Sequence, residues 1–178
     1  MIFLAAIYVL TIGVFIVLPL ASFEKTFPYI YPLIRYWGKF VLYGTGFRID
    51  YKKLVPLDPK ENYVFIANHT SIMDIMLMLT ILKHHPIVFV GKAELLKIPI
   101  FGRIFERICI PVDRKSARSK ALVYPEAKKK LDKNLSIFIF PEGGVTNDKE
   151  FKIYLDPFKD GAFNIAIETQ TPLAVLAI

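Results

Sequence analysis

The sequence has one cysteine, Cys109, and three histidines among its 178 residues. A single cysteine cannot form an internal disulfide, so the fold does not depend on an oxidising compartment. His84 and His85 are adjacent and would point in different directions on a helix, and no Cys or His spacing matches a zinc site. We therefore expect no metal and no bound cofactor, and a cytosolic setting.

Charge is absent from a long N-terminal stretch, because no Asp, Glu, Lys or Arg occurs between Ile2 and Ser22. This apolar run is long enough to cross a hydrocarbon core of about 30 Å, so it predicts a membrane helix that spans or dips into the bilayer. A secretory signal is the alternative, but no basic residue precedes the run and its end is a poor cleavage site. Lys25, Arg35 and Lys39 follow it, which places the rest of the chain in the cytoplasm.

Acidic residues are few, with 16 Asp and Glu against 23 Lys and Arg, for a formal charge of +7. A basic surface suits nucleic acid, anionic lipid or phosphorylated substrates. However, 54% of the residues are hydrophobic and the mean hydropathy is +0.42, which favours a membrane surface. The aromatic residues cluster beside the apolar N-terminal run and not among the basic residues, which argues against nucleic acid.

Residues 27–43 are aromatic and apolar with few charges, and they predict a second helix. This composition suits the membrane headgroup boundary, but it suits the core side of an amphipathic helix equally well. We place both N-terminal helices in residues 1–45. The globular domain then occupies residues 46–178.

Residues 46–178 alternate apolar runs with helical patterns, which predicts an α/β fold. The expected strands are residues 47–51, 63–67, 87–90, 108–112, 136–140 and 172–178, in a mixed sheet flanked by helices. Pro111 suggests that its strand is an edge strand. Because the sequence ends inside an apolar strand, we expect the domain to continue beyond Ile178.

The stretch from Asn68 to Asp74 joins an expected strand to an expected helix and contains a possible base, His69. His69 and Asp74 can meet if His69 precedes the helix and Asp74 lies in its first turn. An imidazole held by a carboxylate titrates in a range suited to removing a proton from an alcohol. The alternative is structural, because Ser71 and Asp74 also form a capping box.

Other candidate residues follow the remaining strands. Lys92 ends one strand, and Arg114 follows another, where it can bind a phosphate or pair with Asp113. Gly143 and Gly144 let backbone amides approach a ligand, or simply form a tight turn. A basic helix over residues 116–132 is either solvated or attracts anionic lipid or an acidic carrier.

Four separated stretches together resemble the lysophosphatidate acyltransferase family, which are membrane-associated glycerolipid acyltransferases with a His-x4-Asp motif. The stretches are residues 68–74 (NHTSIMD), 110–114 (IPVDR), 140–143 (FPEG) and 171–175 (TPLAV). Residues 92–95 (KAEL) and 158–162 (FKDGA) also fit the family. The order and spacing of several motifs are more specific than any one of them.

Two positions depart from the family pattern. Ile108 stands where the second motif usually opens with Gly, and Gly144-Val145-Thr146 replaces the usual Thr-Arg-Ser of the third. That Arg is thought to help bind the acceptor phosphate in the family. Lys92 and Arg114 therefore become the leading phosphate ligands, with Lys149 a weaker candidate.

The resemblance implies that His69 activates the hydroxyl of a lysophospholipid, most simply lysophosphatidate, for attack on an acyl thioester of CoA or an acyl carrier protein. Asp74 would orient His69, and substrate-binding roles fall to Lys92, Arg114, Glu142 and Gly143. We also expect a hydrophobic channel whose length sets acyl-chain preference. The alternatives are another lysolipid acceptor, a hydrolase, and a non-catalytic lipid-binding membrane protein.

Overall fold

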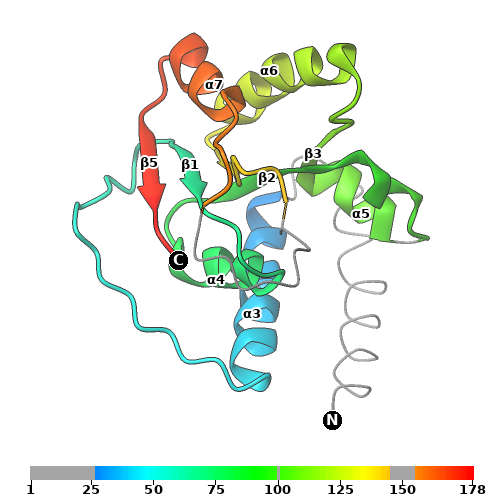
Figure 1. Ribbon diagram of the computed structural model, residues 1–178. Coiled ribbons are helices and arrows are strands. Elements are labelled where there is room, and N and C mark those ends of the chain that lie inside the picture. Colours follow the sequence, from blue (N-terminus) through cyan, green and yellow to red (C-terminus); the bar gives the residue numbers. More distant parts are fainter. Residues whose placement is uncertain (1–26, 100, 145–154) are drawn as a thin grey trace.

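The computed structural model describes residues 27–99, 101–144 and 155–178. The expected membrane helix over residues 2–22 lies outside the described residues, and so do Val145 and Lys149. Five α-helices, one 3-10 helix and five strands make up the described fold (Figure 1). In chain order these are α3 (Phe27–Gly44), β1 (Val64–Ala67), α4 (Met73–Ile81), β2 (Ile87–Lys92), η3 (Ala93–Lys97), α5 (Phe101–Ile108), β3 (Cys109–Val112), α6 (Ala117–Leu131), β4 (Ser136–Ile139), α7 (Gly161–Thr169) and β5 (Leu173–Leu176).

The five described strands form one sheet in the order β3-β2-β4-β1-β5, and every neighbouring pair is parallel. The α/β class is confirmed, but the expected mixed sheet is wrong. Each strand is joined to the next through a helix, and such crossovers return the chain in the same direction. The carboxyl ends of all five strands therefore lie on the same side of the sheet, here called its carboxyl end.

Helices cover both faces of this sheet, with α3 and α4 on one face and α6 and α7 on the other (Figure 1). Successive residues of β1 alternate between the two cores: Val64 and Ile66 pack with α6 and α7, while Phe65 and Ala67 pack with α4 and α3. All four β1 residues are buried, as expected for a parallel strand covered on both sides. The apolar runs of the sequence arise from this double burial.

Helix α3 has one buried side, which fits the core interpretation, and one exposed side; a position at a membrane boundary stays a prediction. Ile30, Tyr31 and Leu42 are buried, and the Arg35 Nε donates to the Leu79 carbonyl of α4 at 3.0 Å. Tyr36 and Phe40 are 71% and 52% exposed. Among the described residues, no helix is both long and apolar enough to cross a membrane.

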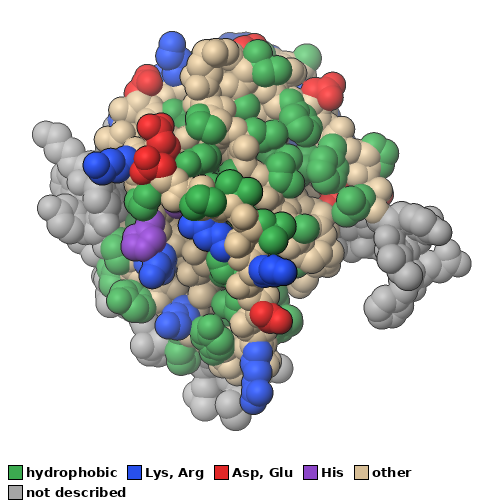
Figure 2. Space-filling view, turned by 90° about the vertical axis from the view of Figure 1, so that its left-hand side faces the viewer, with side chains coloured by type: hydrophobic (Ala, Val, Ile, Leu, Met, Phe, Trp, Pro, Cys, Tyr) green, Lys and Arg blue, Asp and Glu red, His purple; other side chains and the backbone are tan. Residues whose placement is uncertain are grey.

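Residues 47–51 are not a strand, contrary to the expectation from their alternating pattern. The alternation fails to form a strand because no neighbouring strand pairs with it: residues 46–62 run along the outside of the molecule (Figure 1). Phe47, Tyr51, Leu54 and Val55 are exposed. Figure 2 shows the β5 side of the molecule, where apolar side chains are interspersed with single Lys and Arg residues.

β3 lies at the edge of the described sheet, as the proline within it predicts. Pro111 pairs in register with Gly91 of β2, and Lys92 pairs with Val112. Lys92 and Arg114 therefore both lie at the carboxyl end of the sheet, on neighbouring strands. β1 and β4 are also neighbours, which brings the residues that follow them together.

Candidate active site

The centre of the candidate site lies where β1 and β4 end side by side. His69 follows β1, and Glu142 follows β4. The His69 backbone amide donates to Glu142 Oε1 at 2.7 Å, so the contact joins residues that are far apart in the sequence. The parallel order of the sheet therefore assembles this site from motifs separated by more than half of the described chain.

His69 and Asp74 form the hydrogen bond that the spacing predicts, with Nδ1 and Oδ2 2.9 Å apart. His69 precedes α4, and Asp74 lies in the first turn of that helix. Because an ionised carboxylate only accepts hydrogen bonds, Nδ1 of the neutral ring carries the hydrogen. The Nε2 atom is then an acceptor that can take a proton.

Backbone amides hold the Asp74 carboxylate in place. Thr70 N and Ser71 N donate to Oδ2 at 2.7 and 2.8 Å. Burial alone would raise the pKa of Asp74, but the hydrogen bonds from His69, Ser71 and Thr70 outweigh it and lower the pKa below its ordinary value. Asp74 is therefore an ionised, fixed partner for the imidazole at neutral pH.

The capping interpretation is also present in the structure, in a modified form. Ser71 Oγ accepts from the Met73 amide at 3.2 Å, while the Asp74 amide donates to the Ser71 carbonyl at 3.0 Å. The Asp74 carboxylate thus completes the start of α4 and orients His69 at the same time. The two alternatives from the sequence do not exclude each other.

Phe140, the residue that follows β4, supports the imidazole. The rings of His69 and Phe140 are stacked, with centroids 3.9 Å apart and an angle of 15° between their planes. Phe140 also contacts Phe138 and Phe89, at centroid distances of 5.0 and 6.3 Å. An aromatic cluster in the sheet therefore sets the plane of the His69 ring, a contact that the sequence reasoning missed.

Glu142 was predicted to bind substrate, but both of its carboxylate oxygens contact the protein backbone. Oε1 accepts from the His69 amide, and Oε2 accepts from the Asp156 amide at 3.2 Å. This geometry is that of a clamp between the β1–α4 turn and the segment that leads to α7. It supports a positioning role for Glu142.

Three cations surround the turn at Gly143 and Gly144, which have φ values of +90° and +151°. A methyl group at Gly143 would collide with the Lys159 ammonium and lie 3.5 Å from a terminal nitrogen of Arg114. One at Gly144 would lie 3.5 Å from the same Arg114 nitrogen and 3.6 Å from Lys92 Nζ. Glycine is thus favoured here by the positive φ values, and the three cations lie close around the turn.

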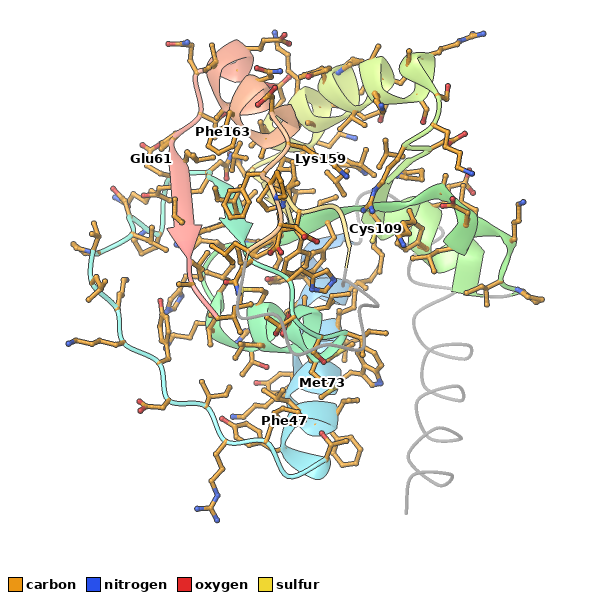
Figure 3. The ribbon with its side chains drawn as sticks, in the orientation of Figure 1. Phe47, Glu61, Met73, Cys109, Lys159 and Phe163 are labelled. Carbon is orange, nitrogen blue, oxygen red and sulfur yellow. The ribbon has the colours of Figure 1, made fainter. Side chains whose placement is uncertain are left out.

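The structure brings the predicted Lys92, Arg114 and Gly143 together and adds Lys159, which sequence reasoning did not select. Lys159 comes from the segment between β4 and α7 (Figure 3). Its amide donates to the Pro141 carbonyl at 3.1 Å, which fixes that segment against the glycine turn. The signal was available, because Lys159 belongs to the stretch at residues 158–162 that fits the family.

Within the described part of the chain, none of the three cations forms an ion pair with a carboxylate. Burial lowers the pKa of Arg114, and the charge of Glu94 partly opposes this shift. Arginine stays protonated at neutral pH in spite of such shifts. Lys92, Arg114 and Lys159, here called the cation cluster, therefore place positive charge around the glycine turn with no ion-paired carboxylate among the described residues.

The glycine amides are only partly available as donors. Gly143 N donates to the Phe140 carbonyl at 3.0 Å and closes the turn. Of the two amides expected to approach a ligand oxygen, the structure thus uses one internally.

Cys109 and His85 lie apart from this chemistry. Cys109 is buried in β3, and burial raises the pKa of its thiol to about 12, so it is not a thiolate nucleophile. His85 precedes β2 and therefore lies at the amino end of the sheet, whereas His69 lies at its carboxyl end. Its ring packs edge-on against Tyr63 and Phe65, and burial lowers its pKa.

The fold and site define an α/β protein with a His–Asp pair and a cation cluster at the carboxyl end of a parallel sheet. Residues 48–178 match the Acyltransferase family, and the chain belongs to that family.

Named relatives agree with this assignment. The chain is 28% identical over 148 residues to a chloroplastic 1-acyl-sn-glycerol-3-phosphate acyltransferase of Brassica napus, covering 82% of this chain and 41% of the relative. It is 30% identical over 135 residues to the 1-acyl-sn-glycerol-3-phosphate acyltransferase of Escherichia coli, covering 75% of this chain and 53% of the relative. The chain therefore spans about half the length, or less, of these curated relatives.

A solved structure has the same fold. The crystal structure of the 1-acyl-sn-glycerophosphate (LPA) acyltransferase PlsC from Thermotoga maritima superposes with a TM-score of 0.67 at 27% sequence identity. The superposition covers 96% of this chain and 69% of that protein.

Proposed function

We propose that this protein transfers a fatty acyl group from an acyl thioester to the free hydroxyl of lysophosphatidate, forming phosphatidate in phospholipid biosynthesis. The observation that carries the proposal is the oriented His69–Asp74 pair beside a glycine turn surrounded by three cations. The pair suits activation of a hydroxyl, and the cations suit a phosphate on the same molecule. The names of the relatives point to the same acceptor.

In the proposed reaction, His69 Nε2 removes the proton of the acceptor hydroxyl as its oxygen attacks the thioester carbonyl. The new C–O bond forms a tetrahedral intermediate, whose collapse breaks the C–S bond. The thiolate leaves and takes the proton from the imidazolium. Asp74 holds the ring throughout and stabilises its charged form, so the histidine returns to its starting state.

Direct attack is favoured over a covalent acyl-enzyme. Cys109 is the chain's one cysteine, and its thiol is buried within β3 with a raised pKa. The hydroxyl oxygen of the acceptor substrate is itself the nucleophile, so the reaction needs no nucleophile from the protein. His69 then serves as the base in a single transfer step.

The cation cluster would bind the acceptor phosphate. Val145 stands where the family resemblance places an Arg, so the charge must come from elsewhere. Lys92, Arg114 and Lys159 converge on the glycine turn and can supply it. Glu142 would act indirectly, by holding His69 and the segment that carries Lys159.

The apolar part of a substrate would lie on the α3 and α4 side of the sheet. A cavity of about 260 Å³ there is lined by Leu42, Phe47, Met73 and Leu77 and reaches Asp74. Figure 3 shows Phe47 and Met73 on this side, close to α3 and α4. We assign this cavity to part of an acyl chain, with Arg48 and Asp50 also in its lining.

The exposed side of α3 would rest on the lipid surface that supplies the acceptor. Leu33, Tyr36, Phe40 and Tyr43 are all exposed on this helix. Aromatic residues of this kind suit the headgroup boundary. Together with the apolar segment at residues 2–22, this arrangement would hold the catalytic domain at the cytoplasmic side of a membrane.

Mass spectrometry tests the proposal directly. Purified protein in detergent would be incubated with lysophosphatidate and either acyl-CoA or acyl carrier protein, and phosphatidate would be measured beside a His69→Ala control. We expect phosphatidate with the native protein and none above background with the control. Folded protein of full natural length that yields no product with either donor would rule out lysophosphatidate as acceptor.

A further inference from the structure

The exposed cations of α6 form a surface that the proposed site does not use. Residues 115–133 contain seven of the chain's 23 Lys and Arg residues, but only two of its 16 Asp and Glu residues. Six of the seven are exposed. Five of these six define what we call the basic face of α6, with Lys115 and Lys133 flanking the helix: Lys115, Arg118, Lys128, Lys129 and Lys133. Lys120 lies two residues after Arg118 and points to another side of the helix. Its opposite side, with Val123, Ala127 and Leu131, packs on the sheet.

Helix stability does not explain the cations at the start of α6. The first turn has no acidic residue, although Arg118 and Lys120 lie close to the helix N-terminus. Cations there oppose the helix dipole, at a typical cost of about 0.3–1 kcal/mol each. Lys128, Lys129 and Lys130 lie in the last turn, where the dipole favours them. The helix dipole therefore accounts for the cations at the C-terminal end of α6 but not for those at its N-terminal end, which a bound ligand would explain.

The basic face begins next to the cation cluster. Arg114, which approaches Gly143 and Gly144, is followed directly by Lys115 and the α6 N-cap Ser116. The link is fixed, because the Asp113 amide donates to Ser119 Oγ and the Lys115 amide donates to Asp113 Oδ1, each at 2.9 Å. A ligand on this face would therefore lie beside the reaction centre.

The face also has an apolar component. Leu122 is 55% exposed and lies one helical turn after Arg118, on the same side of α6. Protein–protein contacts have an apolar centre and a polar rim, and complementary charge guides their association. The 15 residues of α6 extend for about 22 Å, so the charge is spread over a protein-sized surface.

The position of α6 distinguishes a protein partner from a membrane. α6 and α7 cover one face of the sheet, and α3 covers the other (Figure 1). Three exposed aromatic residues that suit a lipid surface, Tyr36, Phe40 and Tyr43, belong to α3. A membrane that contacts α3 would lie across the sheet from α6, so α6 would face the aqueous side.

We infer that the basic face of α6 is the docking site of a soluble, acidic carrier protein that delivers the acyl chain as a thioester. This inference rests on the proposed acyl transfer. Acidic side chains of the carrier would pair with the cations of α6, Leu122 would contact an apolar residue among them, and the tethered thioester would reach His69 past Arg114. The donor would then be recognised mainly through its carrier and not only through its acyl chain.

The test is the double variant Lys115→Glu/Arg118→Glu, because acidic residues near a helix N-terminus are favourable and should keep α6 intact. Initial rates would be measured in detergent at low salt with the same acyl group on an acidic acyl carrier protein and on CoA. We expect kcat/KM with the carrier donor to fall more than about 10-fold, and with the CoA donor less than about 2-fold. High salt should remove most of the difference.

A matched double variant, Lys52→Glu/Lys83→Glu, changes the net charge equally at exposed positions outside α6. It should leave both donors unaffected. Equal losses with both donors, or no loss in the α6 variant, would overturn the inference. So would an α6 variant that keeps carrier-dependent rates but no longer floats with vesicles of phosphatidylglycerol and phosphatidylcholine, because that result assigns the face to lipid.

Binding of fluorescent carrier protein, measured by anisotropy, needs no turnover. If no donor supports ester formation, the proposed function fails, and anisotropy still decides the docking site. Tighter binding to the native chain than to the α6 variant supports docking, and equal or absent binding overturns it.

Discussion

The two halves of the candidate site are built differently. Around His69, nearly every polar group is already bonded within the protein: the ring to Asp74, its backbone amide to Glu142, and the Asp74 carboxylate to two further amides. Around Gly143 and Gly144, the cations converge without a carboxylate partner among the described residues.

This difference separates the proposed roles. A proton-transfer group works best when its position is set before the substrate arrives, and a phosphate site needs charge that the protein itself does not neutralise. We therefore expect changes in the first half to lower kcat, and changes in the second to raise the KM for a phosphorylated acceptor.

The largest effect is expected for Asp74→Asn. The amide has nearly the same shape and can still accept from Thr70 N and Ser71 N, but it lacks the charge that orients and stabilises the imidazole. We predict a fall in kcat of about 10²- to 10⁴-fold with little change in KM, measured by steady-state kinetics. A large rise in KM with kcat preserved would show that Asp74 contributes to binding instead.

A smaller effect is expected for Lys159→Met, which keeps much of the side chain's length and removes its charge. Loss of one charge-assisted hydrogen bond to phosphate predicts a rise in the KM for lysophosphatidate of about 10- to 100-fold. Lys83→Met, at an exposed position after α4, is the matched control. If both variants behave alike, the cation cluster is not the phosphate site.

Phe140→Leu should have a modest effect. Removing the stacked ring frees the imidazole plane, and aromatic pairs of this kind contribute about 0.5–1.5 kcal/mol, which predicts a 2- to 10-fold loss of kcat. Phe140→Tyr should restore most of the rate, since it keeps the stacked face. A tyrosine variant as slow as the leucine variant would argue that packing in the sheet, and not the stack, is responsible.

The smallest effect concerns stability in acid. The pKa of Asp74 is lower in the folded chain than its unfolded value of about 3.9, so its contribution is fully present above that pH. This contribution is lost as the pH falls through the lowered folded value. Urea unfolding between about pH 5 and pH 2 should therefore show a steeper loss for the native chain than for Asp74→Asn. Parallel curves would mean that the hydrogen bonds do not favour the ionised carboxylate.

Sequence reasoning predicted the elements that are buried on both faces, because continuous apolar runs such as residues 63–67 leave few other options. It failed at residues 47–51, where alternation alone indicated a strand that has no neighbour to pair with. It also predicted a mixed sheet, which was wrong. Strand direction depends on the path of the connections between strands and not on the local sequence pattern.

Within the site, the His69–Asp74 contact followed from spacing across one helix start, which is a local constraint. The Glu142 clamp, the Phe140 stack and the approach of Lys159 depend on β1 and β4 being neighbours, which only the strand order reveals. Residues 145–154, which include the departure at Val145, lie outside the described part of the chain.

The most direct test of the central claim compares two acceptors, lysophosphatidate and the 1-acylglycerol of the same chain length, in the native chain, Asp74→Asn and Lys159→Met. The claim predicts that Asp74→Asn slows both acceptors by the same factor, while Lys159→Met impairs only the acceptor that carries a phosphate. Equal impairment of both acceptors by Lys159→Met, or a changed acceptor preference in Asp74→Asn, would contradict it.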